Sequence, residues 1–376
     1  MPWMERDTMS LRREFVELAG QSGTSIAALS RRFGISRKTA YKWLGRAKLD
    51  AVAGLANLSR RPKRTPTRTD MEMEQRVVAL RQEYHWGGRK LHAYLRNRGV
   101  GQLPAPSTIT HILHRHGMIA PEQSAQREHP QSFTRECPNE LWQMDFKGHF
   151  RLDQGRCHPL TVLDDHSRFA LGLQACADER RGTVQARMID LFRRYGLPEA
   201  ILCDNGPPWG YEAGHRHTRL TAWWMRLGIR PMHGRPYHPQ TQGKDERFHR
   251  SLNEEVLQHK PLTSLEACQA HFDRWRQIYN HDRPHEALSM QVPASRYRIS
   301  PREYPEALAP IAYATGHVRQ VNHRGTISFE GRRHQIGKAF AGLPVAARET
   351  STAGCYEVYF CSFVVHRIDL SQPASD

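Results

Sequence analysis

The sequence predicts a multidomain protein that combines a helical N-terminal third, an α/β core and a small β-rich C-terminal domain. In the N-terminal third, apolar residues recur at helical spacing between glycine turns. Across 135–300, short apolar runs alternate with helical patterns, as in proteins built on an α/β sheet. From 308 to 370, β-branched and aromatic residues stand in short stretches between glycines, which predicts a small β-barrel. A chain of 376 residues has room for about two to four such domains.

The composition indicates a polyanionic partner. The formal net charge is +17 and the isoelectric point is near 9.9. An anionic membrane could also attract such a chain, but no long apolar run and no basic amphipathic helix stands out, so we expect no membrane association. No apolar signal segment is seen near the first residue, and seven scattered cysteines favour a reducing compartment. We therefore expect a cytoplasmic protein.

Residues 1–56 are predicted to form a first helix-turn-helix domain. Three short helices are expected, and the third opens at Ser36. Its cations are Arg37, Lys38, Lys42 and Arg46. The last three share one face at i, i+4 and i+8, so this helix is the candidate for entering a DNA major groove. The alternative is a small helical bundle with a basic surface.

Residues 57–69 are predicted to form a basic linker. The segment holds five cations, two prolines and no acid, and the candidates for contacting DNA phosphates are Arg60, Arg61, Lys63 and Arg64. Residues 1–70 carry 15 Lys or Arg and 6 Asp or Glu, a net charge of +9. A flexible solvated linker would explain the prolines but not the sign of the charge.

Residues 70–120 are predicted to form a second helix-turn-helix domain, followed by a polar linker over 121–134. Gly87-Gly88 separates its first two helices, and Pro106-Ser107 starts the third. Two such units in tandem could recognise a longer DNA sequence than one.

Two carboxylates in the core are predicted to lie at strand ends. Asp145 follows the apolar run that starts at Leu141. Asp204 follows 200–203 and precedes Asn205-Gly206. In open α/β sheets, ligands bind outside the carboxyl ends of the strands.

A third carboxylate stands on a predicted helix near 244–257. Phe248, Leu252 and Val256 recur at i, i+4 and i+8 and form its apolar face. Glu246 points away from that face and shares a polar edge with Arg250 and Asn253. An ordinary solvated helix face is the alternative interpretation.

Several motifs appear in a fixed order along the core. They are Asp145, Asp204-Asn205-Gly206, His238-Pro239-Gln240-Thr241-Gln242-Gly243-Lys244-x-Glu246-Arg247-Phe248-His249, and Tyr279-Asn280-His281-Asp282-Arg283-Pro284-His285-x-Ala287-Leu288. Over 135–300 they resemble the DDE catalytic core of retroviral integrases and bacterial insertion-sequence transposases. One departure is that 246 − 204 − 1 = 41 residues separate the last two acids, more than is common in that family. The excess fits an inserted loop around 207–217.

The resemblance implies an RNase H-like core and a DNA transposase. Asp145, Asp204 and Glu246 would be both the catalytic residues and the ligands of two Mg²⁺ ions, for which Mn²⁺ can substitute. Lys244 and Arg250, together with His238, would position DNA. The enzyme would bind the terminal inverted repeats of an insertion sequence, cut the 3′ ends and transfer them into target DNA. The implied partner is double-stranded DNA, with the protein acting as a dimer or larger assembly at the bacterial nucleoid.

Other acids and other functions also fit parts of this sequence. Asp164 and Asp165 also end an apolar run, but the resemblance implies that this segment is structural, and we expect Asp164 or Asp165 to pair with Ser167 or Arg168. Nearby alternatives to Glu246 are Asp245, Glu254 and Glu255. The rival functions are a DNA-binding regulator with an inactive core, a nuclease that does not join DNA, and a His/Cys metalloprotein. The C-terminal barrel could bind DNA or act only in assembly.

Overall fold

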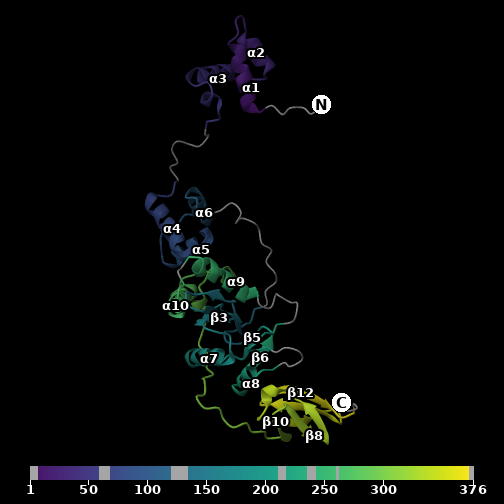
Figure 1. Ribbon diagram of the computed structural model, residues 1–376. Helices are drawn as coiled ribbons and strands as arrows, with labels where there is room; N and C mark the ends of the chain where they lie inside the picture. Colours follow the sequence, from purple (N-terminus) through teal and green to yellow (C-terminus); the bar gives the residue numbers. More distant parts are fainter. Residues whose placement is uncertain are drawn as a thin grey trace. The chain divides into compact units, whose positions relative to one another are not determined.

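The computed structural model describes residues 7–58, 68–119, 134–210, 217–234, 243–259 and 262–371. Figure 1 traces the chain. It divides into two compact units, Met1–Arg68 and Thr69–Asp376. The linker cations Arg60, Arg61, Lys63 and Arg64, and His238 of the core motif, lie outside the described residues.

The first unit is a bundle of short helices. They are α1 (Thr8–Ala19), α2 (Ile26–Arg32), α3 (Arg37–Leu49) and the 3₁₀ turn η1 (Ala53–Leu55). Phe15, Leu29 and Ala40 form its core. The Ser36 hydroxyl accepts a hydrogen bond from the Thr39 amide at 3.1 Å, which caps α3 as expected.

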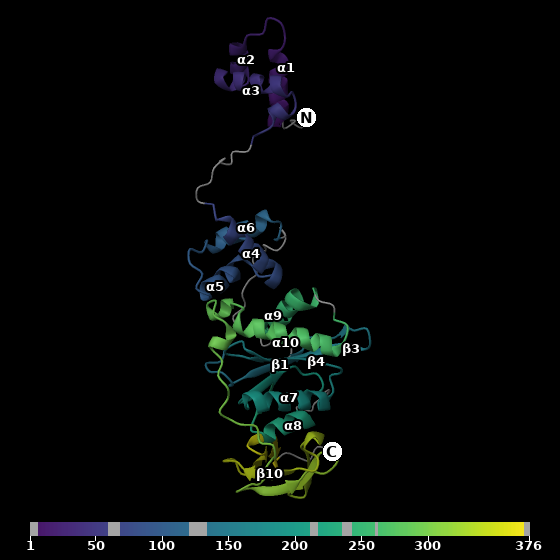
Figure 2. The same ribbon diagram turned by 90° about the vertical axis from the view of Figure 1, so that its left-hand side faces the viewer.

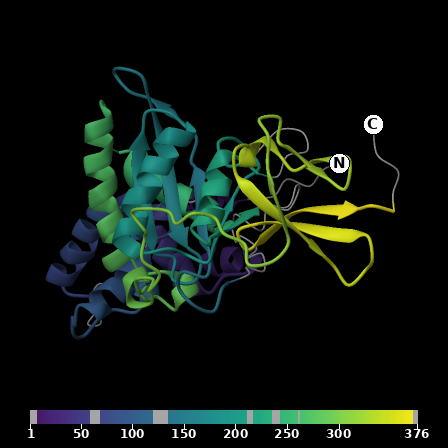
Figure 3. The same ribbon diagram turned by 90° about the horizontal axis from the view of Figure 1, so that it is seen from below.

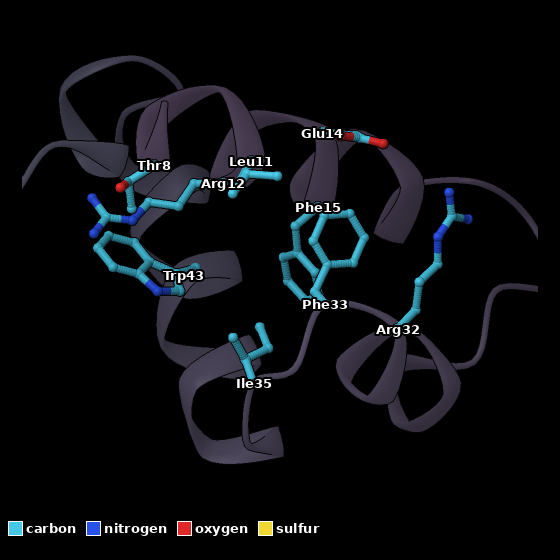
Figure 4. Close-up of a pocket in the computed structure, with 9 residues that line it drawn as sticks. All are labelled: Thr8, Leu11, Arg12, Glu14, Phe15, Arg32, Phe33, Ile35 and Trp43. Carbon is cyan, nitrogen blue, oxygen red and sulfur yellow. The ribbon is translucent and has the colours of Figure 1, made fainter. Parts of the chain in front are cut away.

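A pocket of about 480 Å³ opens between α1 and α3 of this unit (Figure 4). The rings of Phe15 and Phe33 meet edge to face at its base, with centroids 5.5 Å apart. The Arg12 guanidinium lies 3.9 Å from the centroid of the Trp43 ring. This pocket contains none of the predicted catalytic carboxylates.

The second unit begins with three helices. They are α4 (Met71–Tyr84), α5 (Gly88–Asn97) and α6 (Pro106–Arg115). Asp70 caps α4 by accepting from the Met73 amide at 2.7 Å. A Cβ on Gly88 would lie 2.3 Å from Thr110 Oγ1, so α5 and α6 approach each other more closely than a larger residue would allow.

A six-stranded mixed sheet forms the centre of this unit. Its strands are β1 (Trp142–Phe146), β2 (Phe150–Arg151), β3 (Arg156–Asp164), β4 (Ala170–Cys176), β5 (Ala200–Cys203) and β6 (Arg230–His233). The order is β2-β3-β1-β5-β6, with β4 on β3. Strand β1 runs antiparallel to β3 and parallel to β5, and β5 runs parallel to β6.

Helices cover both faces of the sheet (Figure 2). They are α7 (Arg181–Tyr195), α8 (Arg219–Arg226), α9 (Gly243–Leu252) with its π-helical continuation η4 (Asn253–Leu257), and α10 (Leu265–His281). On β3, Val162 faces the cluster formed with α7 and α8, including Trp224. Its neighbour Leu163 faces the cluster formed with α9 and α10. Both faces of β3 are therefore buried, as in α/β folds.

The C-terminal region is β-rich as predicted, but it does not form the expected closed barrel (Figure 3). Its strands are β7 (His317–Gln320), β8 (Thr326–Phe329), β9 (Arg332–Gln335), β10 (Pro344–Glu349), β11 (Cys355–Phe360) and β12 (Phe363–Asp369). The structure has an open sheet, β12-β11-β10-β7, and a separate hairpin, β8-β9.

Three short 3₁₀ turns lie between the longer elements after α10: η5 (Glu286–Leu288), η6 (Pro293–Ser295) and η7 (Lys338–Phe340). Within the described residues, no helix is both long and apolar enough to span a membrane.

The turn between β3 and β4 buries two adjacent carboxyl groups. Asp164 is 0% exposed and accepts from the amides of Asn139 and Ser167 and from the Ser167 hydroxyl. Burial raises the pKa of Asp164, and the Ser167 hydroxyl opposes that shift. Asp165 is 1% exposed and accepts from the Arg135 amide, Gln143 Nε2 and Lys244 Nζ. The expected pairing with Ser167 is confirmed, and these acids have a structural role.

We predict that Asp164→Ala lowers the free energy of unfolding by about 3 kcal/mol, because it strands two buried amides and a hydroxyl. Urea denaturation followed by circular dichroism measures this loss. Asp153→Ala, at an exposed carboxylate on the same domain, is the matched control and should cost less than about 0.5 kcal/mol. Equal stability of the two variants would contradict a structural role for Asp164.

Candidate active site

Asp145 and Asp204 lie at the same end of two neighbouring parallel strands. Asp145 is the fourth residue of β1, and Asp204 directly follows β5. The observed register pairs Trp142 with Ile201 and Gln143 with Leu202. Extended by two residues, it places Asp145 opposite Asp204, about 5 Å away across the strand spacing. Both side chains are half-buried.

The electrostatics of Asp145 report this proximity. Burial is the main cause that raises its pKa to about 7, and the charge of Asp204 is the next. Glu179 and Glu246 add smaller contributions of the same sign. Like charges held together outside bulk water favour protonation or the arrival of a cation.

Helix α9 carries Glu246 on its exposed side. Phe248, Leu252 and Val256 are buried against α10 and the sheet, so the predicted apolar face is confirmed. Glu246 and Arg250 are exposed, whereas Asn253 is half-buried. Asp245, the alternative acid next to Glu246, is 1% exposed, and burial raises its pKa well above the ordinary value. Of the two acids, only Glu246 presents its carboxylate to solvent.

Lys244 anchors the start of α9. Its ammonium lies 2.5 Å from Asp165 Oδ1, and its side chain is 11% exposed. Burial, followed by the charge of Arg168, lowers the pKa of Lys244 to about 8, while Asp165 opposes the shift. This contact fits a structural anchor better than the DNA contact expected from sequence.

A single hydroxyl connects Asp145 to the helix of Glu246. Thr161 Oγ1 donates to the Asp145 carbonyl at 2.9 Å. His249 Nε2 lies 2.9 Å from the same hydroxyl and therefore donates to it. Burial, and then the charge of Lys147, lowers the pKa of His249 to about 4, which keeps the imidazole neutral.

The Asp204 carboxylate is held through one of its oxygens. The Gly206 amide donates to Oδ1 at 3.0 Å, and the indole N–H of Trp209 donates to the same oxygen. A Cβ on Gly206 would lie 3.1 Å from Oδ2, so the glycine leaves space beside that oxygen. Sequence reasoning treated 207–217 as a loop and missed Trp209. A tryptophan among prolines and glycines was the available signal.

The donor set fits a hard divalent cation. Asp145 and Asp204 supply carboxylate oxygens, the ligands that Mg²⁺ prefers, and Gly206 places no side chain beside Oδ2 of Asp204. Within the described part of the chain, no three His, Cys, Asp or Glu side chains already form a metal-binding group. Asp145, Asp204 and Glu246 therefore do not form such a group, although the charge of Glu246 contributes to the raised pKa of Asp145.

The predicted DNA-binding helix α3 presents only part of its basic set. Arg37, Lys38 and Lys42 are exposed. Arg46 instead packs over the Trp43 ring and donates to the Ala56 carbonyl at 2.7 Å, which holds η1 against α3. Tyr41 is 61% exposed and shares the outward surface with Lys38 and Lys42, although sequence reasoning did not select it.

Models of known families match residues 11–113, 135–293 and 316–375. Integrase core domain models match 135–239 and 227–293. Helix-turn-helix and homeodomain-like models match 11–63 and 39–113. The model of the C-terminal domain of IS481 family transposases matches 316–375.

Curated relatives include proteins of bacterial insertion elements. The IS476 uncharacterized 39.2 kDa protein of Xanthomonas euvesicatoria is 26% identical, covering 72% of this chain and 78% of its own length. The IS407 uncharacterized 31.7 kDa protein of Burkholderia multivorans is 28% identical, covering 69% and 92%. A shorter match, 30% identical over 115 residues, is to the Gag-Pro-Pol polyprotein of squirrel monkey retrovirus and covers 31% of this chain and 6% of the polyprotein.

Solved structures with partial similarity include two retroviral integrases. The simian T-cell lymphotropic virus intasome chain aligns at 17% identity with a TM-score of 0.40, covering 78% of this chain and 96% of its own. The HTLV-2 integrase catalytic core in complex with magnesium aligns at 17% identity with a TM-score of 0.34, covering 43% and 99%.

We predict that His249 makes stability depend on pH. Its pKa is about 4 in the folded protein, below the ordinary value of 6.5 that the unfolded chain retains, so the unfolded chain binds a proton first as pH falls. The stabilising contribution is complete above about pH 6.5 and falls by roughly 2 kcal/mol at pH 5. Urea midpoints measured at pH 7.5 and pH 5 should differ less in His249→Gln than in the wild type. The exposed His111→Gln is the control, and an unchanged pH slope in His249→Gln would refute the assignment.

Proposed function

Because this chain has the domains of a bacterial insertion-sequence transposase with an integrase-type core, we propose that it cuts and joins DNA. Its substrate would be the terminal inverted repeats of an insertion sequence. The reaction would be 3′-end cleavage followed by transfer of that end into target DNA. The observation that carries this proposal is the placement of Asp145 and Asp204 at the ends of adjacent parallel strands.

The chain's own residues would hold the reacting groups in place. Asp145 and Asp204 would ligate two Mg²⁺ ions from strand ends, and Glu246 would complete the set from α9. Such ions supply the Lewis acidity that phosphoryl transfer requires. The Thr161 hydroxyl bonds to both the Asp145 carbonyl and His249 of α9, so it fixes the strand and the helix relative to each other.

Two displacements would follow one another at this site. In the first, a water oxygen bonds to the phosphorus at the element's end, and the P–O3′ bond breaks to leave a free 3′-OH. In the second, that 3′ oxygen bonds to a target phosphorus, and the target's own P–O3′ bond breaks. Arg250, exposed one turn after Glu246, would contact the DNA backbone nearby.

The helix-turn-helix units would bring the ends to the core. Arg37, Lys38 and Lys42 are exposed on α3 and would contact DNA, and Arg60, Arg61, Lys63 and Arg64 would follow the backbone beyond it. Synapsis of two ends would require a dimer or a larger assembly, working in the cytoplasm at the nucleoid.

We predict that Asp145→Asn, Asp204→Asn and Glu246→Gln each reduce cleavage and joining by about a hundredfold or more, since each removes an anionic ligand. Labelled end duplexes incubated with Mg²⁺ and separated on a denaturing gel measure both steps. Binding of the ends in a mobility-shift assay should persist.

Glu254→Gln, at an exposed acid farther along the same helical segment, is the matched control and should react as the wild type does. Full activity in any of the three variants would remove that residue from the catalytic set. Tight end binding by folded wild-type protein with neither product would instead favour a regulator with an inactive core. Cutting without joining would indicate a nuclease.

We predict that Lys38→Ala and Lys42→Ala weaken end binding and each reduce the slope of log K against log salt by about 1, because each would release one phosphate contact. Fluorescence anisotropy across a salt series measures the slope. Arg13→Ala removes an exposed cation from α1 and should leave the slope unchanged. If the slopes of Lys38→Ala and Lys42→Ala equal those of Arg13→Ala and the wild type, the DNA binds to another surface.

A further inference from the structure

Trp209 is a buried tryptophan inside a polar turn. It is 1% exposed and belongs to the same apolar cluster as Trp142, Phe192 and Trp224. Its ring stacks on Phe146, with centroids 5.3 Å apart and planes inclined by 14°. Phe146 directly follows Asp145, so one indole ring packs beside the first acid while it bonds to the second.

The indole N–H of Trp209 points at a carboxylate although an apolar core surrounds the ring. It donates to Asp204 Oδ1, which also accepts from the Gly206 amide. No hydrogen bond to Oδ2 is found within the described residues, and Gly206 leaves space beside that oxygen. The two donors therefore fix the carboxylate plane and leave the second oxygen available.

The backbone of the turn is built to hold this arrangement. The Gly210 amide donates to the Gly206 carbonyl at 2.7 Å. A Cβ on Gly210 would lie 2.0 Å from the Asn205 carbonyl oxygen, so no larger residue fits there. Asn205 Nδ2 donates to the Gly234 carbonyl at 3.0 Å and ties the turn to the end of β6.

We propose that Trp209 is a positioning residue for Asp204, which orients the carboxylate so that Oδ2 can ligate a divalent cation. The proposal rests on the metal-dependent function proposed above. Donors that orient a ligating carboxylate raise metal affinity because the ligand is already placed when the ion arrives. Phenylalanine in place of Trp209 could keep the stack on Phe146, but it cannot donate the hydrogen bond.

The test compares Trp209→Phe with Trp224→Phe in the full-length protein. Trp224 is 0% exposed, lies in the same cluster, and its indole nitrogen finds no hydrogen-bond acceptor within the described residues. The two substitutions therefore make the same chemical change in the same core, and only the first removes a bond to a carboxylate. Asp204→Asn serves as the variant that lacks the anionic ligand.

Binding of Mn²⁺ is measured by the electron paramagnetic resonance signal of the free ion, and folding by the thermal midpoint. Trp209→Phe should weaken Mn²⁺ binding about tenfold, while Trp224→Phe stays within about twofold of the wild type. Strand transfer by Trp209→Phe should recover as Mg²⁺ is raised. Wild-type Mn²⁺ affinity in folded Trp209→Phe would overturn the proposal, as would equal weakening in Trp224→Phe.

The same titration separates this inference from the proposed function. If Asp204→Asn binds Mn²⁺ as tightly as the wild type, Asp204 is not a metal ligand and both proposals fail. If Asp204→Asn loses binding while Trp209→Phe does not, only the role of Trp209 fails.

A measurement on the wild type tests the proposal even if Trp209→Phe does not fold. Among the indole N–H signals in a nitrogen-correlated NMR spectrum, substoichiometric Mn²⁺ should broaden one before the others, because paramagnetic broadening falls steeply with distance. Uniform response of all the indole signals would overturn the proposal.

Discussion

The core depends on the buried carboxyl pair in the turn between β3 and β4. Asp164 ties that turn to the chain before β1 through Asn139, and Asp165 ties it to the side chain of Gln143 within β1. Asp165 also receives Lys244, the second residue of α9. A buried polar or charged group left without its partners costs free energy, so these contacts stabilise the turn and the elements that it joins. One turn thus sets the position of the strand that carries Asp145 and of the helix that carries Glu246.

The proposed site follows from that arrangement. Asp145 lies on the strand beside β3, where Thr161 binds its carbonyl, and the same hydroxyl receives His249 from α9. Asp204 comes from the other neighbour of β1 and is held by its own turn. Asp145 and Asp204 are thus held by β3, by α9 and by the turn after β5. Rigid elements of this kind keep charged groups close together despite their repulsion. Glu246 is the most exposed of the three and depends on α9 for its position.

Periodicity was enough to predict the strands of Asp145 and Asp204 and the buried face of Phe248, Leu252 and Val256, because those patterns reflect burial directly. Side-chain partners were harder to predict. Lys244 and Arg46 were both predicted to contact DNA. Lys244 instead bonds to Asp165, which is distant in sequence, and Arg46 bonds to the Ala56 carbonyl just after η1. The role of Trp209 was not predicted because its turn has no periodic pattern of apolar residues. Closure of the C-terminal strands also could not be read from alternation, since strand pairing is set by register and neighbours rather than by a single strand.

The parallel pairing of β1 with β5 has a consequence for how the protein is made. Asp145 and Asp204 are 204 − 145 = 59 positions apart, and β2, β3, β4 and α7 lie between them. Parallel strands cannot be joined by a tight turn, so this pair of acids forms only after the intervening segment has folded. Contacts of such sequence separation form slowly, late in the search for the native state. A nascent or partly folded chain can therefore expose the basic segment proposed to bind DNA long before the pair of acids that the proposed cleavage requires has formed.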